Sequence, residues 1–467
     1  MKCLFYGYYI TLLSFFPIGD TTIFANMYPR VKARAKCDGN AGAPLILTPY
    51  LKSGRIELAQ NLSRVPLTTK IGFQSHAGFF TVDPQYNSNL YFWYFPPFSK
   101  QQDAPILLWL QGGPGGSSLY GLFTELGPLI AKKGGFSLRK YHWARNHHLI
   151  FIDNPVGTGF SFTSYRDGYC TDENCIGKGL YSAMLQFFTL FPDLANNDFF
   201  ITGESYAGKY IPVLALEIHN HNMKGVVNKI NLIGMAIGNG FCDPVNQLDY
   251  GSYLYQLGLI DQNQCKLFKE LQKKIVEAIQ AEMWGAADIL MDKLLDGEIA
   301  NFSYFKSFTG FNSYYNFLIT EDHTDMSVFM DLLENDSIRQ SIHVGGLPFN
   351  SGENVVFNLS LDILQSVAPI ISELLSHYRI LFYNGQLDIV VAYPLTENFL
   401  RNLAFSGSQE YSKAPRAIWL VDGEIAGYIK KAGNLTEALV RNAGHMVPRD
   451  QPKWAFDLIT RFVRNKL

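Results

Sequence analysis

Residues 198–218 read DFFITGESYAGKYIPVLALEI, and this stretch decides the fold class. Phe199 to Thr202 is a short apolar run with strand propensity, a turn of small residues surrounds Ser205, and a pattern compatible with a helix follows. Small neighbours let the chain turn sharply and hold the Ser205 Oγ clear of the backbone, where a base can reach it. The stretch therefore predicts a nucleophilic serine. A Gly-rich turn with a surface serine stays open as the plainer interpretation, because the third small residue is Ala207.

Short apolar strands alternate with helical stretches over most of the chain. The expected strands are 90–95, 106–110, 149–153, 199–202, 230–237, 380–383 and 417–420, and a helical stretch covers 180–191. Fully apolar strands separated by helices are typical of parallel sheets. We predict an α/β fold with a mostly parallel central sheet and helices on both faces.

The segment 242–368 has a different character. No buried-strand run occurs in it, and 264–271 and 284–295 have helical patterns. We predict a helical cap insertion at 242–368, over the C-terminal edge of the sheet. It would divide the core into a first part at 44–241 and a second part at 369–467.

The composition of the chain limits the kinds of partner that it can be expected to bind. The chain has 467 residues, enough for a large core, with 47% hydrophobic residues, 17% charged residues and a net charge of −2. This balance gives no reason to expect a nucleic acid or an anionic membrane as partner. The basic run at 30–36 is interpreted as a solvated segment near the mature N-terminus.

The N-terminus has the pattern of a signal peptide over residues 1–25. Lys2 precedes an apolar, uncharged run at 3–18, and a cut near Ala25 is expected. No later run is long and apolar enough for a membrane anchor. Five Asn-x-Ser/Thr sequons follow, at Asn61, Asn301, Asn335, Asn358 and Asn434. Together these features predict a glycoprotein of the secretory pathway, either secreted or lysosomal.

Six cysteines suit that compartment. Cys3 leaves with the signal peptide, Cys170 and Cys175 flank a short polar loop, and Cys242 with Cys265 is the second candidate pair. Cys37 is then the odd one. No Cys/His spacing is typical of a metal site, and the pairs at 147–148 and 219–221 are interpreted as loop histidines.

A serine nucleophile on this kind of fold needs an acid and then a base later in the chain. Asp388 follows the strand at 380–383 across a turn, and His445 lies in a Gly- and Pro-containing loop after 438–440. Each residue alone is an ordinary loop former. Their order after Ser205 makes Asp388 and His445 the candidates.

A glycine-rich loop at 111–118 directly follows the strand at 106–110. Backbone N–H groups in such a loop can stabilise the oxyanion of a tetrahedral intermediate. A phosphate-binding loop is excluded because no Lys-Ser/Thr follows the glycines.

Five motifs occur together in a defined order. They are LWLQGGPGGSS at 108–118, DNPVGTGFS at 153–161, GESYAG at 203–208, YNGQLD at 383–388 and GHMVPRDQP at 444–452. With them the chain, from about Pro44 to its end, resembles the serine carboxypeptidases, acid-active peptidases of the α/β-hydrolase fold. Gln111 replaces the usual Asn and Gly116 the usual Cys, so the chain is similar to the vitellogenic-carboxypeptidase-like branch.

The resemblance implies a role for each matching residue. Ser205 would be the nucleophile, His445 the general base and then acid, and Asp388 the residue that orients the imidazole. The N–H groups of Gly113 and Tyr206 would form the oxyanion hole. The carboxylate of the substrate would be held by Gln111, the Gly112 backbone, Glu125 and Glu204. The family needs no metal or organic cofactor, and its substrates are peptide or protein C-termini.

Two carboxyls close together cannot both ionise at low cost, so Glu125 and Glu204 would retain a proton. That proton can be donated to the substrate's carboxylate, which predicts an acidic optimum for peptides. An esterase or acyltransferase on the same fold is one rival function, and a non-catalytic secreted binding protein is another. A homodimer is a further possibility that the sequence does not test.

Overall fold

The structure is a computed structural model that describes residues 28, 32–35, 41–70, 72–132, 135–225, 228–322 and 326–467. The predicted signal peptide and Cys37 lie outside the described residues. Among those residues no helix is long and apolar enough to cross a membrane.

A ten-stranded sheet forms the centre of the described chain, in the order β1-β2-β6-β3-β8-β9-β11-β14-β13-β12. Its strands are β1 His76–Asp83, β2 Ser88–Phe95, β3 Ile106–Leu110, β6 His148–Ile152, β8 Phe199–Glu204, β9 Leu232–Gly238, β11 Arg379–Gly385, β12 Ala417–Val421, β13 Glu424–Ala432 and β14 Leu435–Val440. The block from β6 to β14 is parallel, and the strands on either side of it pair antiparallel. The mostly parallel sheet is therefore confirmed. Sequence patterns missed β1 and β13, and they showed only the end of β14.

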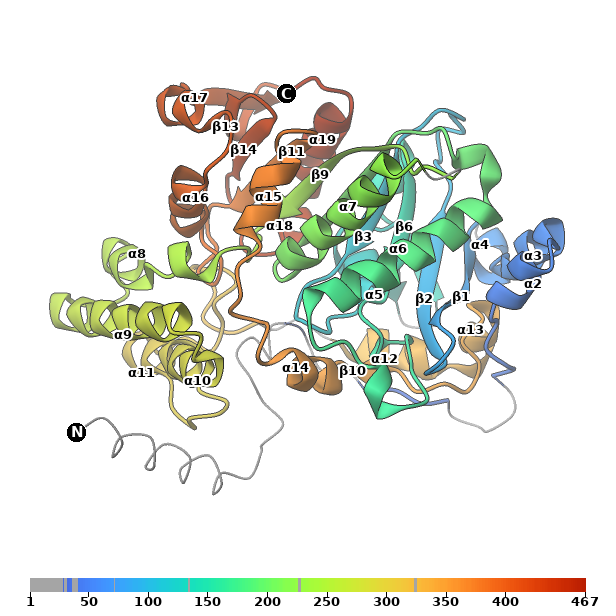
Figure 1. Cartoon of the computed structure of the whole chain (residues 1–467), viewed down its shortest axis with the longest axis horizontal. Helices are drawn as coiled ribbons and strands as arrows, with labels where there is room; N and C mark the ends of the chain where they lie inside the picture. The colour runs from blue at the N-terminus through green and yellow to red at the C-terminus, as the bar shows by residue number, and fades with distance from the viewer. Residues whose placement is uncertain are drawn as a thin grey trace.

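Side chains alternate between two cores, one on each face of the sheet. In β3, Leu108 belongs to the first core and Trp109 to the second, as successive strand residues should. Phe187 of α6 (Glu173–Leu190) and Leu214 of α7 (Ala207–Met223) complete the first core, and Phe462 of α19 (Pro452–Val463) completes the second. α6 and α7 lie across the front of the strands in Figure 1.

The helices have the following bounds: α2 Thr48–Lys52, α3 Ile56–Ser63, α4 Pro66–Lys70, α5 Ser118–Tyr120, α6 Glu173–Leu190, α7 Ala207–Met223, α8 Tyr250–Gln256, α9 Gln262–Gln280, α10 Trp284–Leu294, α11 Tyr304–Thr309, α12 Ser327–Glu334, α13 Asp336–Ser341, α14 Glu353–Leu359, α15 Ala368–Leu374, α16 Tyr393–Asn402, α17 Ser408–Lys413, α18 Val447–Asp450 and α19 Pro452–Val463. A π-helical turn, Gly121–Glu125, follows α5. Single 3-10 turns cover Trp143–Arg145, Arg166–Gly168, Pro192–Leu194 and Pro244–Asn246. Two small antiparallel pairs complete the described chain: β4 Leu129–Lys132 with β5 Gly135–Leu138, and β7 Thr158–Gly159 with β10 Asn350–Ser351.

Between β9 and β11 the described chain is mainly helical, as the patterns predicted. The expected helices at 264–271 and 284–295 lie within α9 and α10. Asp261 begins α9 with a capping box, in which its side chain accepts from the Gln264 N–H and Gln264 reaches back. α8 to α11 gather on one side of the molecule in Figure 1. The division into a core and a cap domain stays a prediction.

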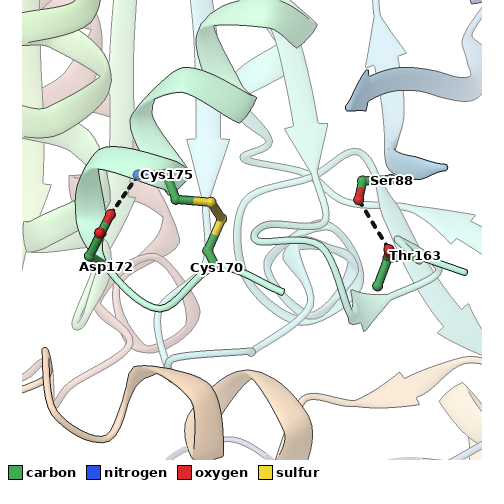
Figure 2. The surroundings of a disulfide bond; sticks show 5 residues. All are labelled: Ser88, Thr163, Cys170, Asp172 and Cys175. Atoms are coloured by element: carbon green, nitrogen blue, oxygen red, sulfur yellow. Dashed lines mark hydrogen bonds between the residues drawn. A yellow bond between two sulfur atoms is a disulfide. The ribbon is translucent and has the colours of Figure 1, made fainter. Parts of the chain in front are cut away.

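One of the two candidate cysteine pairs is formed. Cys170 and Cys175 are bonded at the start of α6, beside the N-cap Asp172, whose side chain accepts from the Cys175 N–H at 2.8 Å (Figure 2). The predicted Cys242–Cys265 pair is wrong, because both thiols are free and buried. The Cys242 thiol instead donates to the Gly208 carbonyl at 3.3 Å, so it packs against the start of α7.

Candidate active site

The turn after β8 has the sharp backbone conformation that its small residues predicted. Ser205 has a positive φ of 62°, and α7 begins two residues later at Ala207. A Cβ on Gly203 would lie 2.3 Å from the Leu110 carbonyl, and one on Gly208 would lie 2.8 Å from Cys242 Sγ. Glycine is therefore required on both sides of the turn, which is the arrangement of a nucleophile elbow.

The carboxyl ends of β8, β9, β11 and β14 meet at one edge of the sheet. The Ser205 N–H donates to the Gly238 carbonyl at 2.9 Å, and the side chain of the next residue, Asn239, donates to Asp388 Oδ2 at 2.6 Å. Asp388 Oδ2 also lies 2.9 Å from His445 Nδ1. Parallel neighbours thus bring the three predicted triad residues, separated by up to 240 positions in the sequence, to one edge.

The Asp388–His445 pair is fully buried, with both side chains at 0% exposure. Asp388 also accepts from the N–H groups of Val390 at 3.0 Å and Val391 at 3.2 Å. These bonds fix the carboxylate, and the carboxylate fixes the imidazole through Nδ1. Nε2 is then the ring nitrogen left to exchange a proton with a nucleophile.

The glycine-rich loop lies directly against the elbow. A Cβ on Gly112 would be 2.6 Å from the Tyr206 N and 2.7 Å from the Ser205 Cβ, so only a glycine permits this approach. Gly113 has a φ of 121°, which also favours glycine. The Gly112 backbone therefore lies against the Tyr206 N, and Gly113 is the next residue of the loop.

Asp153, from the second of the five motifs, stabilises this loop by hydrogen bonds. Its carboxylate accepts from the Ser117 hydroxyl at 2.5 Å, the Ser118 N–H at 3.0 Å and the Phe160 N–H at 2.9 Å. Burial raises the pKa of Asp153 to about 6, although these hydrogen bonds favour its ionised form.

Glu125, at the end of the π-helical turn, meets Glu204, at the end of β8. The Gln111 amide joins them, donating to Glu125 Oε1 at 3.0 Å and to Glu204 Oε1 at 2.7 Å. The Trp109 indole in turn donates to Gln111 Oε1 at 2.8 Å and fixes the amide's orientation. Both acids are buried, at 0% and 1% exposure. Neither Oε2 has a hydrogen-bond partner among the described residues.

Burial raises the pKa of both acids, and the charge of Glu125 raises the pKa of Glu204 further. The two carboxyls therefore retain a proton well above the pH at which an exposed glutamate loses it. A protonated acid can donate a hydrogen bond to an incoming carboxylate. Sequence reasoning alone had no means of pairing these two residues.

Three residues that sequence reasoning missed support the triad. The Asn239 side chain donates to Asp388, the Tyr253 hydroxyl donates to the Asp388 carbonyl at 2.8 Å, and the Tyr315 backbone carbonyl accepts from the His445 backbone N–H at 2.7 Å. The Tyr315 ring lies 5.7 Å from the His445 ring, centroid to centroid. Asn239 had a weak signal, an Asn-Gly pair after a strand; the two tyrosines, from the helical region, had none.

Four of the predicted glycosylation sites are exposed, and Asn358 is half-buried. Asn335 caps α13, Asn358 donates to the Asn354 carbonyl, and Asn434 donates to the Leu375 carbonyl. Elsewhere, no group of three or more His, Cys, Asp or Glu side chains in the described residues could hold a metal ion.

Comparison with known proteins gives a consistent result. The family model described as serine carboxypeptidase matches residues 66–465. The chain is 49% identical to a venom serine carboxypeptidase of Apis mellifera, covering 98% of this chain and 99% of that one. It is 50% identical to a vitellogenic carboxypeptidase of Aedes aegypti, covering 97% and 98%, and 44% identical to a human probable serine carboxypeptidase, CPVL, covering 98% and 97%.

Among solved structures, the chain is similar to Kex1(delta)p, a prohormone-processing carboxypeptidase from Saccharomyces cerevisiae. The TM-score is 0.71 at 25% identity, and the match covers 84% of this chain and 91% of the yeast chain. Kex1(delta)p thus shares the same large mixed sheet with mostly parallel strands.

Proposed function

The chain belongs to the serine carboxypeptidase family, and we propose that Ser205, Asp388 and His445 are the triad through which it releases single C-terminal amino acids. The observation that carries this proposal is the pair of buried glutamates, Glu125 and Glu204, which adjoins the serine. Such a pair provides a proton donor for a terminal carboxylate, the group that distinguishes an exopeptidase substrate.

In the proposed mechanism each of these residues has one role. His445 takes the proton of Ser205, whose Oγ attacks the last peptide carbonyl, and the N–H groups of Gly113 and Tyr206 stabilise the oxyanion. His445 then gives the proton to the departing amino acid. Water attacks the acyl-enzyme with His445 again as the base, and the collapse of the second tetrahedral intermediate frees Ser205.

Substrate binding involves the acid pair. The Oε2 atoms of Glu125 and Glu204 lack partners in the described chain, and the retained proton can bond the substrate's carboxylate together with the Gly112 N–H. The Gln111 amide uses both of its N–H groups on the two glutamates. We infer that it acts mainly by holding them in place, and that it reaches the substrate only by releasing one of them.

We further propose that the protein follows the secretory pathway, to the cell exterior or to lysosomes, with glycans at some of the five sequons. The names of the venom and vitellogenic relatives support this location. Residues 242–368 would act as a cap, since Tyr253 and Tyr315 from this segment contact the Asp388 and His445 loops.

The test is the release of C-terminal amino acids from a blocked dipeptide across pH, with Ser205→Ala and the exposed Ser376→Ala as a matched pair. We expect release at acidic pH that falls towards neutrality, vanishes in Ser205→Ala and persists in Ser376→Ala. Hydrolysis of small esters without peptide release would support an esterase instead. Inertness of a folded wild type towards both substrates would favour a binding protein.

A further inference from the structure

We propose that Tyr28 is an autoinhibitory residue, whose side chain fills the site for the substrate's terminal carboxylate. The inference rests on the function proposed above. It concerns how access to that site is controlled, because a peptide could bind only after Tyr28 leaves.

Tyr28 is in direct contact with the acid pair. Its hydroxyl donates to Glu204 Oε1 at 2.8 Å, the same oxygen that accepts from the Gln111 amide. The Tyr28 side chain is buried, with 6% of its surface exposed, and its ring packs edge-on against Tyr120 at a centroid distance of 5.5 Å. The Tyr28 hydroxyl, bonded to Glu204, therefore occupies the position in which the substrate's terminal carboxylate would bind.

Gly116 makes room for this ring. A Cβ at position 116 would lie 2.8 Å from Tyr28 Cδ2 and 2.8 Å from the Gly112 carbonyl. A cysteine, which is the usual residue of the family at this position, would contact the tyrosine ring. Gly116 therefore leaves space for the Tyr28 ring, and a larger residue at position 116 would not.

Residues 32–34 have contacts of their own with the chain around Phe349. Ala33 pairs antiparallel with Phe349, whose N–H donates to the Ala33 carbonyl at 2.8 Å, and Ala33 is buried. Lys32 forms an ion pair with Glu353 at 2.6 Å. The basic side chains of Lys32 and Arg34 are exposed, as expected for a solvated run, whereas Ala33 between them is buried. Residues 32–34 also line a cavity of about 550 Å³ with residues 348–354.

The ion pair of Lys32 and the hydrogen bond of Tyr28 differ in strength. The Lys32 side chain is 67% exposed, so its ion pair contributes little, whereas Tyr28 is buried and hydrogen-bonded to an acid. Because Ala33 keeps its own backbone pairing with Phe349, the Tyr28 side chain can leave Glu204 without unfolding the core. A peptide then competes with Tyr28 for Glu204, while a small ester without a terminal carboxylate does not need that site.

The experiment compares Tyr28→Ala with Tyr165→Ala, an exposed tyrosine elsewhere on the surface, in chains whose intact mass shows that residues 28–35 are present. The kcat and KM of a blocked dipeptide and of a small acyl ester are measured at acidic pH. We expect Tyr28→Ala to lower the KM of the dipeptide at least about tenfold and to leave the ester unchanged. Tyr165→Ala should match the wild type in both assays.

Tyr28→Phe, which keeps the ring and loses only the hydroxyl, should lower the KM of the dipeptide by a smaller factor, and it serves as the test if the Ala variant does not fold. Equal KM values in wild type and Tyr28 variants would overturn the proposal. A higher KM in Tyr28→Ala would also overturn it, because Tyr28 would then be a permanent part of the substrate site. Failure of every variant to cleave dipeptide or ester would refute the proposed function, and the inference with it.

Discussion

At the scale of single residues, the proposed reactivity of Ser205 depends on an acid that is held from several sides. Asp388 is bonded by His445, by Asn239 and by two backbone N–H groups, with no exposed surface. Each donor removes one way for the carboxylate to turn. The imidazole is consequently oriented by residues that never contact the substrate, and Asn239 is the one among them that can be tested most directly.

Asn239→Gly should lower kcat while leaving KM nearly unchanged. Glycine suits the positive φ of 40° at this position, so the change removes the side chain's hydrogen bonds, to Asp388 and from the Gly385 N–H at 3.2 Å, without backbone strain. A hydrogen bond to a charged group contributes about 1.5–3 kcal/mol, which corresponds to a loss of roughly 10- to 100-fold in kcat. Asn465→Gly, at an exposed site with a φ of 53°, is the matched control. An unchanged kcat would mean that Asn239 does not position the triad.

Glu204→Gln should flatten the pH dependence of KM for a peptide. In the wild type, burial and the charge of Glu125 raise the pKa of Glu204, so the acid pair loses its proton only as pH rises, and KM for peptides rises with it. Glutamine keeps a neutral donor at every pH. The measurement is KM from acidic to neutral pH for a dipeptide and for an ester lacking the carboxylate.

The ester should show no such change, and Glu277→Gln on the exposed face of α9 should behave as the wild type does. A KM that rises equally steeply with pH in Glu204→Gln would contradict the role given to this carboxyl.

At the scale of elements, the site is made from the ends of strands and the starts of helices. β8 ends at Glu204 and α7 begins at Ala207, so Ser205 lies between two rigid elements. The start of α6 is similarly fixed, by the Asp172 cap and by the bond between Cys170 and Cys175 (Figure 2). Its first residue, Glu173, is buried.

Replacing both Cys170 and Cys175 by serine should lower the stability of the folded protein modestly. The two cysteines are 5 positions apart, and closing so short a loop removes little entropy from the unfolded chain, worth roughly 2 kcal/mol. Thermal unfolding should show a midpoint lowered by a few degrees. Reductant should lower the midpoint of the wild type and have no effect on the double variant; a double variant as stable as the oxidised wild type would show that the bond is dispensable.

At the scale of the whole molecule, buried titratable groups link stability to pH in opposite directions. Burial raises the pKa of Glu173 to about 8. The unfolded chain ionises this acid near its ordinary value, so the folded state binds more protons between the two pKa values and loses stability as pH rises through that window. Buried histidines act in the opposite sense, with pKa values lowered by burial to about 3 for His142 and about 4 for His76, His147 and His148. For them the unfolded chain binds more protons, and stability is lost as pH falls below about 6.5.

Above about pH 7.5 these histidines are almost entirely neutral in both states, so the acids decide the trend. We expect the thermal midpoint of the wild type to fall between about pH 7.5 and 8.5, on either side of the pKa of Glu173. Glu173→Gln should reduce this fall, because glutamine does not titrate, whereas Glu410→Gln, at an exposed site, should not. A midpoint that is constant over this range would contradict the raised pKa of Glu173.

The sequence by itself determined the sheet strands β2, β3, β6, β8, β9, β11 and β12, the elbow around Ser205 and the glycine-rich loop, and it made Cys170–Cys175 one of two candidate disulfides. These features are encoded locally: apolar runs specify buried strands, and glycines specify turns that no other residue permits. Asp388 and His445 could also be predicted as partners of Ser205, because a serine nucleophile on this fold needs an acid and then a base later in the chain.

Only the tertiary structure decided which distant residues meet. Glu125 and Glu204 were brought together by the pairing of strands and the turn after α5, and Tyr28 reached Glu204 across 176 positions. The Cys242 thiol met the Gly208 carbonyl rather than Cys265. Such contacts depend on sheet order and on the packing of loops at its edge. No pattern of neighbours along the chain contains that information, since the partners share no local periodicity.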